Sequence, residues 1–189
     1  MALILKESDV EQLLTMPLAI ERVEAAHREY SAGEAIDIPR ERTRLPKAAL
    51  HILQGAVPSA GVFGYKAYTS SREGIRFIVY VFSAERGNLE GIVEANLLGM
   101  VRTGAAAGVA TRALARADAS VAGVIGTGWQ ARGQAEAIAA VRPLSRIKAW
   151  SRSPEKLAKF CARMSAKTSV EVVPAASAED AVRGSHVVS

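Results

Sequence analysis

A chain of 189 residues, 49% of them hydrophobic, is long enough for one large domain or two smaller ones, and its apolar content excludes global disorder. The net charge of +5 comes from arginines scattered among acidic residues without interleaved aromatics, so we expect no nucleic-acid partner. No apolar run reaches the roughly 18–20 residues that span a bilayer, the N-terminus lacks a secretory signal pattern, and the single cysteine excludes an internal disulfide, so a cytoplasmic protein without membrane contact is expected.

The N-terminal half is predicted to contain two helices followed by an antiparallel sheet. Residues 2–5 predict a short strand, and residues 8–33 predict two helices, the second beginning at Pro17. The β-rich runs that follow, separated by turns, are residues 50–57, 62–69, 75–82 and 89–93. Because consecutive runs are joined by short turns, we expect successive hairpins.

The C-terminal half is predicted to alternate between strands and helices. A helix rich in small residues covers residues 94–117 and precedes a junction at 117–120. The strands predicted after it are residues 121–126, 146–150, 170–173 and 186–189, with helices at 129–141, 154–165 and 177–183. This alternation implies a parallel sheet with right-handed crossovers, so an α/β protein is expected, with domains at residues 1–118 and 119–189. The chain ends within an apolar run, and we expect the second domain to be incomplete.

A glycine-rich turn follows the strand predicted at residues 121–126. Its residues are Gly126, Thr127, Gly128, Trp129, Gln130 and Ala131. The first glycine permits a tight turn, the second lets the backbone approach phosphates, and the small residue at 131 lets helix and strand pack closely. With a strand before it and a helix after it, the turn predicts a dinucleotide-binding site.

The end of the next strand bears on the type of nicotinamide cofactor. Ser151 and Arg152 stand where an NAD-binding protein places a carboxylate for the ribose 2′-hydroxyl. Arginine pairs with phosphate through two parallel hydrogen bonds, so NADP(H) is favoured over NAD(H). The alternative is that Arg152 is a solvated residue at a strand end.

Three segments resemble the ornithine cyclodeaminase/μ-crystallin family. They are residues 92–107 with Arg102-Thr103, residues 113–116, and the glycine turn with its Gln130. The resemblance covers the whole chain but only the N-terminal part of a family member. It implies a substrate-binding and dimerisation domain at residues 1–118, a partial NAD(P)-binding Rossmann domain at 119–189, and a homodimer formed through the first.

The resemblance also implies roles for three residues. Lys66 matches the active-site lysine that binds substrate, and Arg102 matches an arginine at the junction of substrate and cofactor. Thr103 then falls among the cofactor-binding residues. Independently, Lys66 lies inside an apolar β run, where an unpaired ammonium is costly and a carboxylate ligand would explain it. The alternative is a solvent-facing lysine on an alternating strand.

The roles of two further positions have alternative interpretations. Arg40 fits the family's Pro-Arg pair best as a ligand of the substrate carboxylate, but Arg42 and Arg44 share its face in an extended segment. His51 occupies the place where ornithine-specific members have an acid, which weakens an ornithine assignment. His51 is therefore interpreted either as a substrate contact or as a structural histidine that is bonded to the backbone.

The implied function is an NAD(P)-dependent reaction at the C–N centre of a small amino or imino acid, as in a ketimine reductase or an amino-acid dehydrogenase. The alternatives are an ammonia-releasing cyclodeaminase and a non-catalytic, crystallin-like NADPH-binding protein. The family's catalytic aspartate lies beyond the segment that resembles residues 185–189, so we expect the chain alone to be inactive. Cys161 is expected to pack in a helix, and no metal is proposed because the histidines lack ligand spacing.

Overall fold

The computed structural model describes residues 1–189 as two compact units, each treated separately below. Unit 1 comprises Met1–Thr15 and Glu24–Gly99, and unit 2 comprises Met16–Val23 and Met100–Ser189. Helices α2 (Met16–Ser31) and α3 (Asn96–Leu114) therefore contribute residues to both. None of the helices combines the length and the apolar character needed to cross a membrane. The assignment of substrate and cofactor domains to residues 1–118 and 119–189 stays a prediction.

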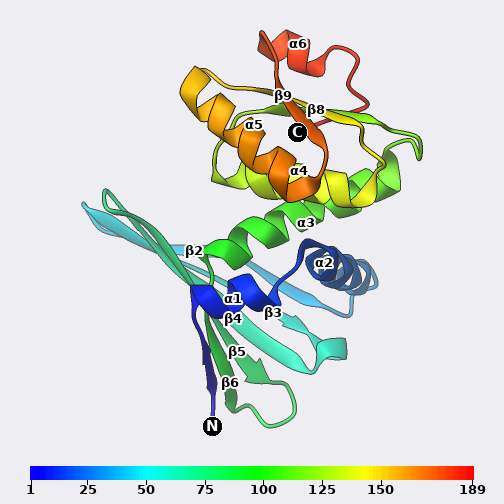
Figure 1. Ribbon diagram of the computed structural model, residues 1–189. Coiled ribbons are helices and arrows are strands. Elements are labelled where there is room, and N and C mark those ends of the chain that lie inside the picture. Colours follow the sequence, from blue (N-terminus) through cyan, green and yellow to red (C-terminus); the bar gives the residue numbers. More distant parts are fainter. The chain divides into compact units, whose positions relative to one another are not determined.

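Unit 1 is built on a six-stranded sheet with the order β1-β6-β5-β4-β3-β2 (Figure 1). Its strands are β1 (Leu3–Leu5), β2 (Ile36–Arg44), β3 (Ala48–Val57), β4 (Val62–Ser71), β5 (Gly74–Ser83) and β6 (Leu89–Glu94). Strands β3 to β6 pair in antiparallel succession, so the predicted hairpins are confirmed. Strand β2, which was not among the predicted strands, pairs antiparallel with β3 as well. The short helix α1 (Glu7–Leu13) and the 3-10 turn η1 (Pro58–Ala60) complete the unit.

The edge strand β2 carries a β-bulge. Its register on β3 shifts between Ile38 and Glu41, and the intervening Pro39 and Arg40 both lie opposite Leu53. Proline has no N–H to donate to a ladder and is tolerated at such irregularities. The bulge therefore changes the register of β2 on β3 at Arg40.

Unit 2 contains a parallel four-stranded sheet with the order β10-β7-β8-β9. The elements in chain order are β7 (Val121–Ile125), α4 (Trp129–Val141), β8 (Arg146–Trp150), α5 (Pro154–Thr168), β9 (Glu171–Pro174), α6 (Ala178–Val182) and β10 (Val187–Val188). Every predicted strand and helix is present, and the Rossmann-type α/β class is confirmed. Strands β8 and β10 flank β7 on opposite sides, so the strand order reverses at β7.

The two faces of this sheet are covered by different helices (Figure 1). On one face Val124 and Ile147 are buried with Ile138 of α4 and Phe160 of α5. On the other face Gly123 leaves room for α6, whose backbone would collide with any added Cβ. The core therefore fixes β7 between α4 and α6.

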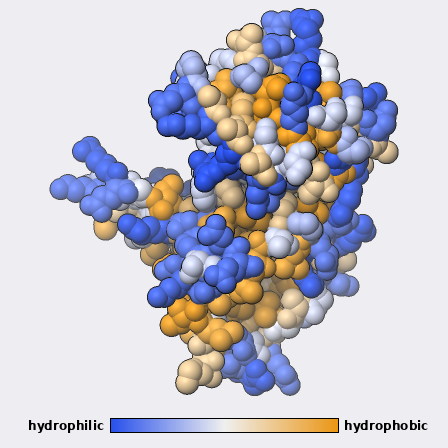
Figure 2. Space-filling view, in the orientation of Figure 1, coloured by the Kyte–Doolittle hydropathy of each residue, from blue (hydrophilic) through white to orange (hydrophobic).

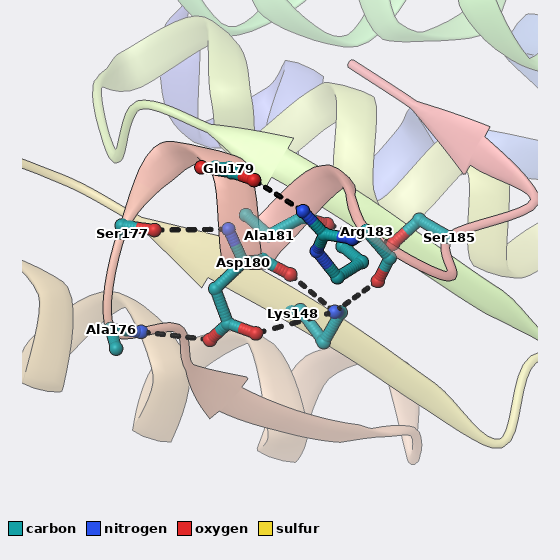
Figure 3. Close-up of polar contacts among 8 residues, drawn as sticks. All are labelled: Lys148, Ala176, Ser177, Glu179, Asp180, Ala181, Arg183 and Ser185. Atoms are coloured by element: carbon teal, nitrogen blue, oxygen red, sulfur yellow. Dashed lines mark hydrogen bonds and ion pairs between the residues drawn. The ribbon is translucent and has the colours of Figure 1, made fainter.

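A lysine on β8 holds the end of helix α6 (Figure 3). The Lys148 ammonium donates to the carbonyl oxygens of Asp180 and Arg183, the latter at 2.6 Å, and lies 3.8 Å from the Asp180 carboxylate. At the other end of α6 the Ser177 hydroxyl accepts from the Asp180 N–H at 3.0 Å. Both ends of this short helix are thus satisfied by side chains.

Helices α3 and α4 cross at a pair of glycines within unit 2. A Cβ built on Gly104 would lie 2.9 Å from the Cα of Gly133, and one built on Gly133 would lie 2.7 Å from the Met100 carbonyl oxygen. Real Cβ atoms essentially never approach backbone this closely. The backbones of the two helices are therefore in direct contact, which gives the small residues predicted at 94–117 their packing role.

Candidate functional site

The glycine turn lies at the carboxyl end of β7, where the strand order reverses. In open α/β sheets this is the position at which ligands bind. Gly126 has φ +104, a left-handed conformation that favours glycine, and its N–H donates to the Trp150 carbonyl at 2.8 Å. The turn is therefore tied to the end of the neighbouring strand β8.

The second glycine leaves the start of α4 accessible. Gly128 is the N-cap residue of α4 and offers no side chain to accept from the first N–H groups of the helix. An ideal Cβ on Gly128 would meet no atom within 4 Å, so the space beside the backbone is open. Ala131 packs against the core of the unit. An open, uncapped helix N-terminus of this kind fits the pyrophosphate of a dinucleotide.

The other predicted residues of unit 2 lie on helix α4, on helix α3 and in the segment that follows strand β8. Trp129 is 46% exposed at the start of α4, and Gln130 beside it is also exposed. After β8, Ser151 is half-buried and Arg152 is exposed. On α3, the exposed Arg102 lies between Met100 and Gly104, the two residues whose backbones approach Gly133 of α4. Their roles in binding stay predictions.

On unit 1 a row of side chains crosses four strands on one face of the sheet. The register pairs Arg42 of β2 with His51 of β3, His51 with Tyr68 of β4, and Tyr68 with Phe77 of β5. Directly paired residues point to the same face. The His51 and Tyr68 rings stack with their centroids 4.3 Å apart and an interplanar angle of 1°.

Cationic side chains surround the Tyr68 ring in this row. Lys66 is half-buried, and its Nζ lies 5.6 Å from the ring centroids of both Tyr68 and Phe77. The Arg40 guanidinium carbon lies 6.0 Å from the Tyr68 centroid. The structure thus brings Arg40, Arg42, His51 and Lys66 together on one face, with aromatic rings that stabilise positive charge. Tyr68 was not predicted from the sequence, although its spacing of two from Lys66 places both on the same face.

His51 has an unusual electrostatic environment. Burial lowers its pKa first, and the positive charges of Arg42, Arg40 and Arg44 lower the pKa further, so this environment favours the uncharged imidazole over the charged one. Its Nε2 lies 3.0 Å from the Ser70 hydroxyl, whereas its buried Nδ1 has no hydrogen-bond partner. The alternative interpretation of His51 predicts a hydrogen bond to the backbone. The structure instead places its hydrogen bond at the Ser70 side chain.

Two other predicted residue groups can be placed. Cys161 is buried in the core of unit 2, and burial raises the pKa of its thiol, as a packing role requires. The Nδ1 atom of His186 accepts from the Ser120 N–H at 3.0 Å. No cluster of three potential ligands is arranged to hold a metal ion.

Comparisons with known proteins identify similar sequences and structures. The family model described as "Ornithine cyclodeaminase/mu-crystallin family" matches residues 1–189. A delta(1)-pyrroline-2-carboxylate reductase of Bacillus cereus is 30% identical over 197 residues, which cover 98% of this chain and 60% of that protein. The chain thus spans about 60% of the length of such relatives.

Two solved structures resemble the whole chain closely. The Thermococcus litoralis delta(1)-pyrroline-2-carboxylate reductase in complex with NADH and L-proline matches with a TM-score of 0.91 and 29% identity, over 98% of this chain and 60% of that one. An archaeal alanine dehydrogenase dimer with bound NAD matches with a TM-score of 0.84 and 29% identity, over 92% of this chain and 55% of that one.

Proposed function

Since this chain belongs to the ornithine cyclodeaminase/mu-crystallin family, we propose that it forms part of an NAD(P)-dependent enzyme acting at the C–N centre of a small amino or imino acid. The observation that carries the proposal is the glycine turn of unit 2. Its left-handed Gly126 lies where the strand order reverses, and its Gly128 leaves the N-terminus of α4 open. This geometry fits a dinucleotide, and the two similar solved structures contain NADH and NAD.

Unit 2 is proposed to hold the cofactor. The backbone of residues 126–131 would bind the pyrophosphate, and Arg102 and Thr103 would lie at the cofactor as the family resemblance implies. NADP(H) is proposed in preference to NAD(H), because Ser151 and Arg152 replace the expected carboxylate. When bound, the reduced nicotinamide supplies a hydride to the carbon of a C=N bond.

Unit 1 is proposed to bind the substrate. The ammonium of Lys66 and the guanidinium of Arg40, or of the neighbouring Arg42, would bind its carboxylate, since these cations share one face of the sheet. The ring of His51, whose pKa is lowered, would stand beside these cations as an uncharged polar group. A neutral ring does not pair with a distal ammonium as an acid does, which favours the reductase over ornithine cyclodeamination.

A homodimer formed through unit 1 is proposed as well. The face of the sheet opposite Lys66 carries exposed apolar side chains, among them Ile36 (55%), Ile38 (40%) and Phe63 (43%). Figure 2 shows further hydrophobic surface around the N-terminal strand β1, where Ile4 is 68% exposed. A second copy would cover this surface, and the similar alanine dehydrogenase is a dimer. Sedimentation should give a dimer, and a monomer at micromolar concentration would contradict it.

The function is tested by cofactor binding and by turnover. NADH and NADPH are titrated into the chain and into a Gly128→Val variant, which fills the open space beside α4. Binding that the variant loses supports the proposal, whereas no binding of either nucleotide contradicts it. Oxidation of NADPH with cyclic ketimines would support the reductase, and ammonia release from ornithine would support the cyclodeaminase. Binding without either reaction is the result expected if these 189 residues alone are inactive, and it fits the non-catalytic alternative equally well. Inactivity of these 189 residues alone and a cytoplasmic location stay predictions.

A further inference from the structure

A basic cleft lies between helices α4 and α5 of unit 2. It has a volume of about 500 Å³ and is lined on one side by the turn residues 127–129. The rest of the lining consists of Phe160 and four cationic side chains, namely Arg132 of α4 and Lys156, Lys159 and Arg163 of α5. The α5 residues are spaced by three and four positions, so they share one face of that helix. We call this the α4–α5 cleft.

The positive charge of the α4–α5 cleft is largely uncompensated. Lys159 pairs with Glu155 at 2.6 Å, but Arg132, Lys156 and Arg163 form no ion pair. No carboxylate lines the cleft. Arg132 is half-buried with its guanidinium carbon 5.4 Å from the Trp129 ring centroid. Burial, and then the charge of Arg163, lower the Arg132 pKa. Cations held together against mutual repulsion make a site for an anion.

The position of the cleft indicates which anion it would hold. In this fold class the ribose 2′-hydroxyl of a bound dinucleotide lies at the carboxyl end of the second strand, which is β8 here. Helix α5 begins at Pro154, shortly after β8 ends, and the hydrogen bond from Gly126 to Trp150 joins that end to the glycine turn. The α4–α5 cleft adjoins both the turn and the first turns of α5.

We propose that the α4–α5 cleft binds the 2′-phosphate of NADP(H) and thereby selects it over NAD(H). This rests on the proposed function, because it needs a dinucleotide on the glycine turn. Arg132, Lys156 and Arg163 contact the phosphate, a group that carries about −1.5 to −2 charge near pH 7. Arg152, which the sequence singled out for this role, does not line the cleft and contributes less.

The experiment compares NADPH with NADH, which differ only in this phosphate. Both are titrated at one ionic strength into the full chain and into the variants Arg132→Gln, Lys156→Gln and Arg163→Gln. Lys167→Gln is the matched control, because Lys167 is on α5 outside the cleft and pairs with Glu136. We expect each cleft variant to weaken NADPH binding about five- to tenfold while NADH binding changes less than about twofold. The control should change neither, and circular dichroism should show every variant folded.

The outcomes separate this inference from the function on which it rests. If neither nucleotide binds the unmodified chain, both fail. If NADH binds but the cleft variants leave NADPH binding unchanged, or weaken both nucleotides equally, the cleft assignment fails and the dinucleotide site stands. A larger loss of NADPH binding in Arg152→Gln than in every cleft variant would also overturn it, in favour of the strand-end arginine.

Discussion

The backbone contact between α3 and α4 makes the substitution Gly104→Ala strongly destabilising for unit 2. A methyl group at this position would lie 2.9 Å from the Cα of Gly133 and closer still to its carbonyl group. The obstructing atoms are backbone atoms, so no side-chain rotation relieves the collision. The two helices have to move apart, which disturbs the packing of both against the core.

The magnitude follows from two opposing effects. Overpacking costs about 1–3 kcal/mol and sometimes more, and a backbone obstacle places this site at the upper end. Replacing a helical glycine by alanine regains about 1 kcal/mol, so we expect a net loss of about 2 kcal/mol. Gly99→Ala on the same helix is the control, because a Cβ there meets no atom within 4 Å and Gly99 belongs to unit 1, so unit 2 should lose no stability.

The assay is urea unfolding followed by tryptophan fluorescence. The chain has two tryptophans, Trp129 and Trp150, and both lie in unit 2, so the signal reports on this unit alone. The midpoint should fall for Gly104→Ala and stay level or rise for Gly99→Ala. Equal or greater stability of Gly104→Ala would refute the close helix contact.

Three other measurements follow from the hydrogen bonds and charges of particular side chains. Lys148→Met should destabilise unit 2 by about 1–3 kcal/mol, because it leaves carbonyl groups of α6 without a donor, and the same fluorescence assay measures this. Hydrogen bonds from the side chain and backbone of Ser59 lower the pKa of Glu29, so its contribution to stability is present above the unfolded pKa and is lost as pH falls through the folded value. Glu29→Gln should flatten the acid side of a stability–pH profile followed by circular dichroism, and an unchanged slope would contradict the assignment. An NMR titration should place the pKa of His51 below its ordinary value, and Arg42→Gln should raise it only in part, because burial is the larger cause.

Much of unit 2 could be predicted from the sequence because its signals are local. Strand, glycine turn and helix follow one another within a few residues, and the alternation with further strands specifies a parallel sheet. In unit 1 the turns specify the hairpins in the same way. The parallel pairing of Leu3–Leu5 with β6 joins segments far apart in the sequence, and no pattern in so short a strand indicates its partner.

The sites show the same division between local and distant signals. Lys66 and Arg40 were singled out by the family resemblance, and Lys66 also by its place in an apolar run, whereas the ring of Tyr68 between them emerges from cross-strand register. The α4–α5 cleft was missed because Arg132 and Lys156 lie on different helices and meet only when the sheet forms. His51 was identified, but its hydroxyl partner depends on the pairing of β3 with β4.

The bulged strand β2 has a consequence for the behaviour of the protein at high concentration. It is an edge of the six-stranded sheet, and a long regular edge would accept a strand from another molecule and promote aggregation. Pro39 interrupts its row of donors, and the alternating charges around Arg40 and Arg42 oppose a flat intermolecular ladder. Arg40 and Arg42, the two candidates for binding the substrate carboxylate, thus also protect this edge. Neutral substitutions of them should increase light scattering on storage, whereas lysine substitutions should not.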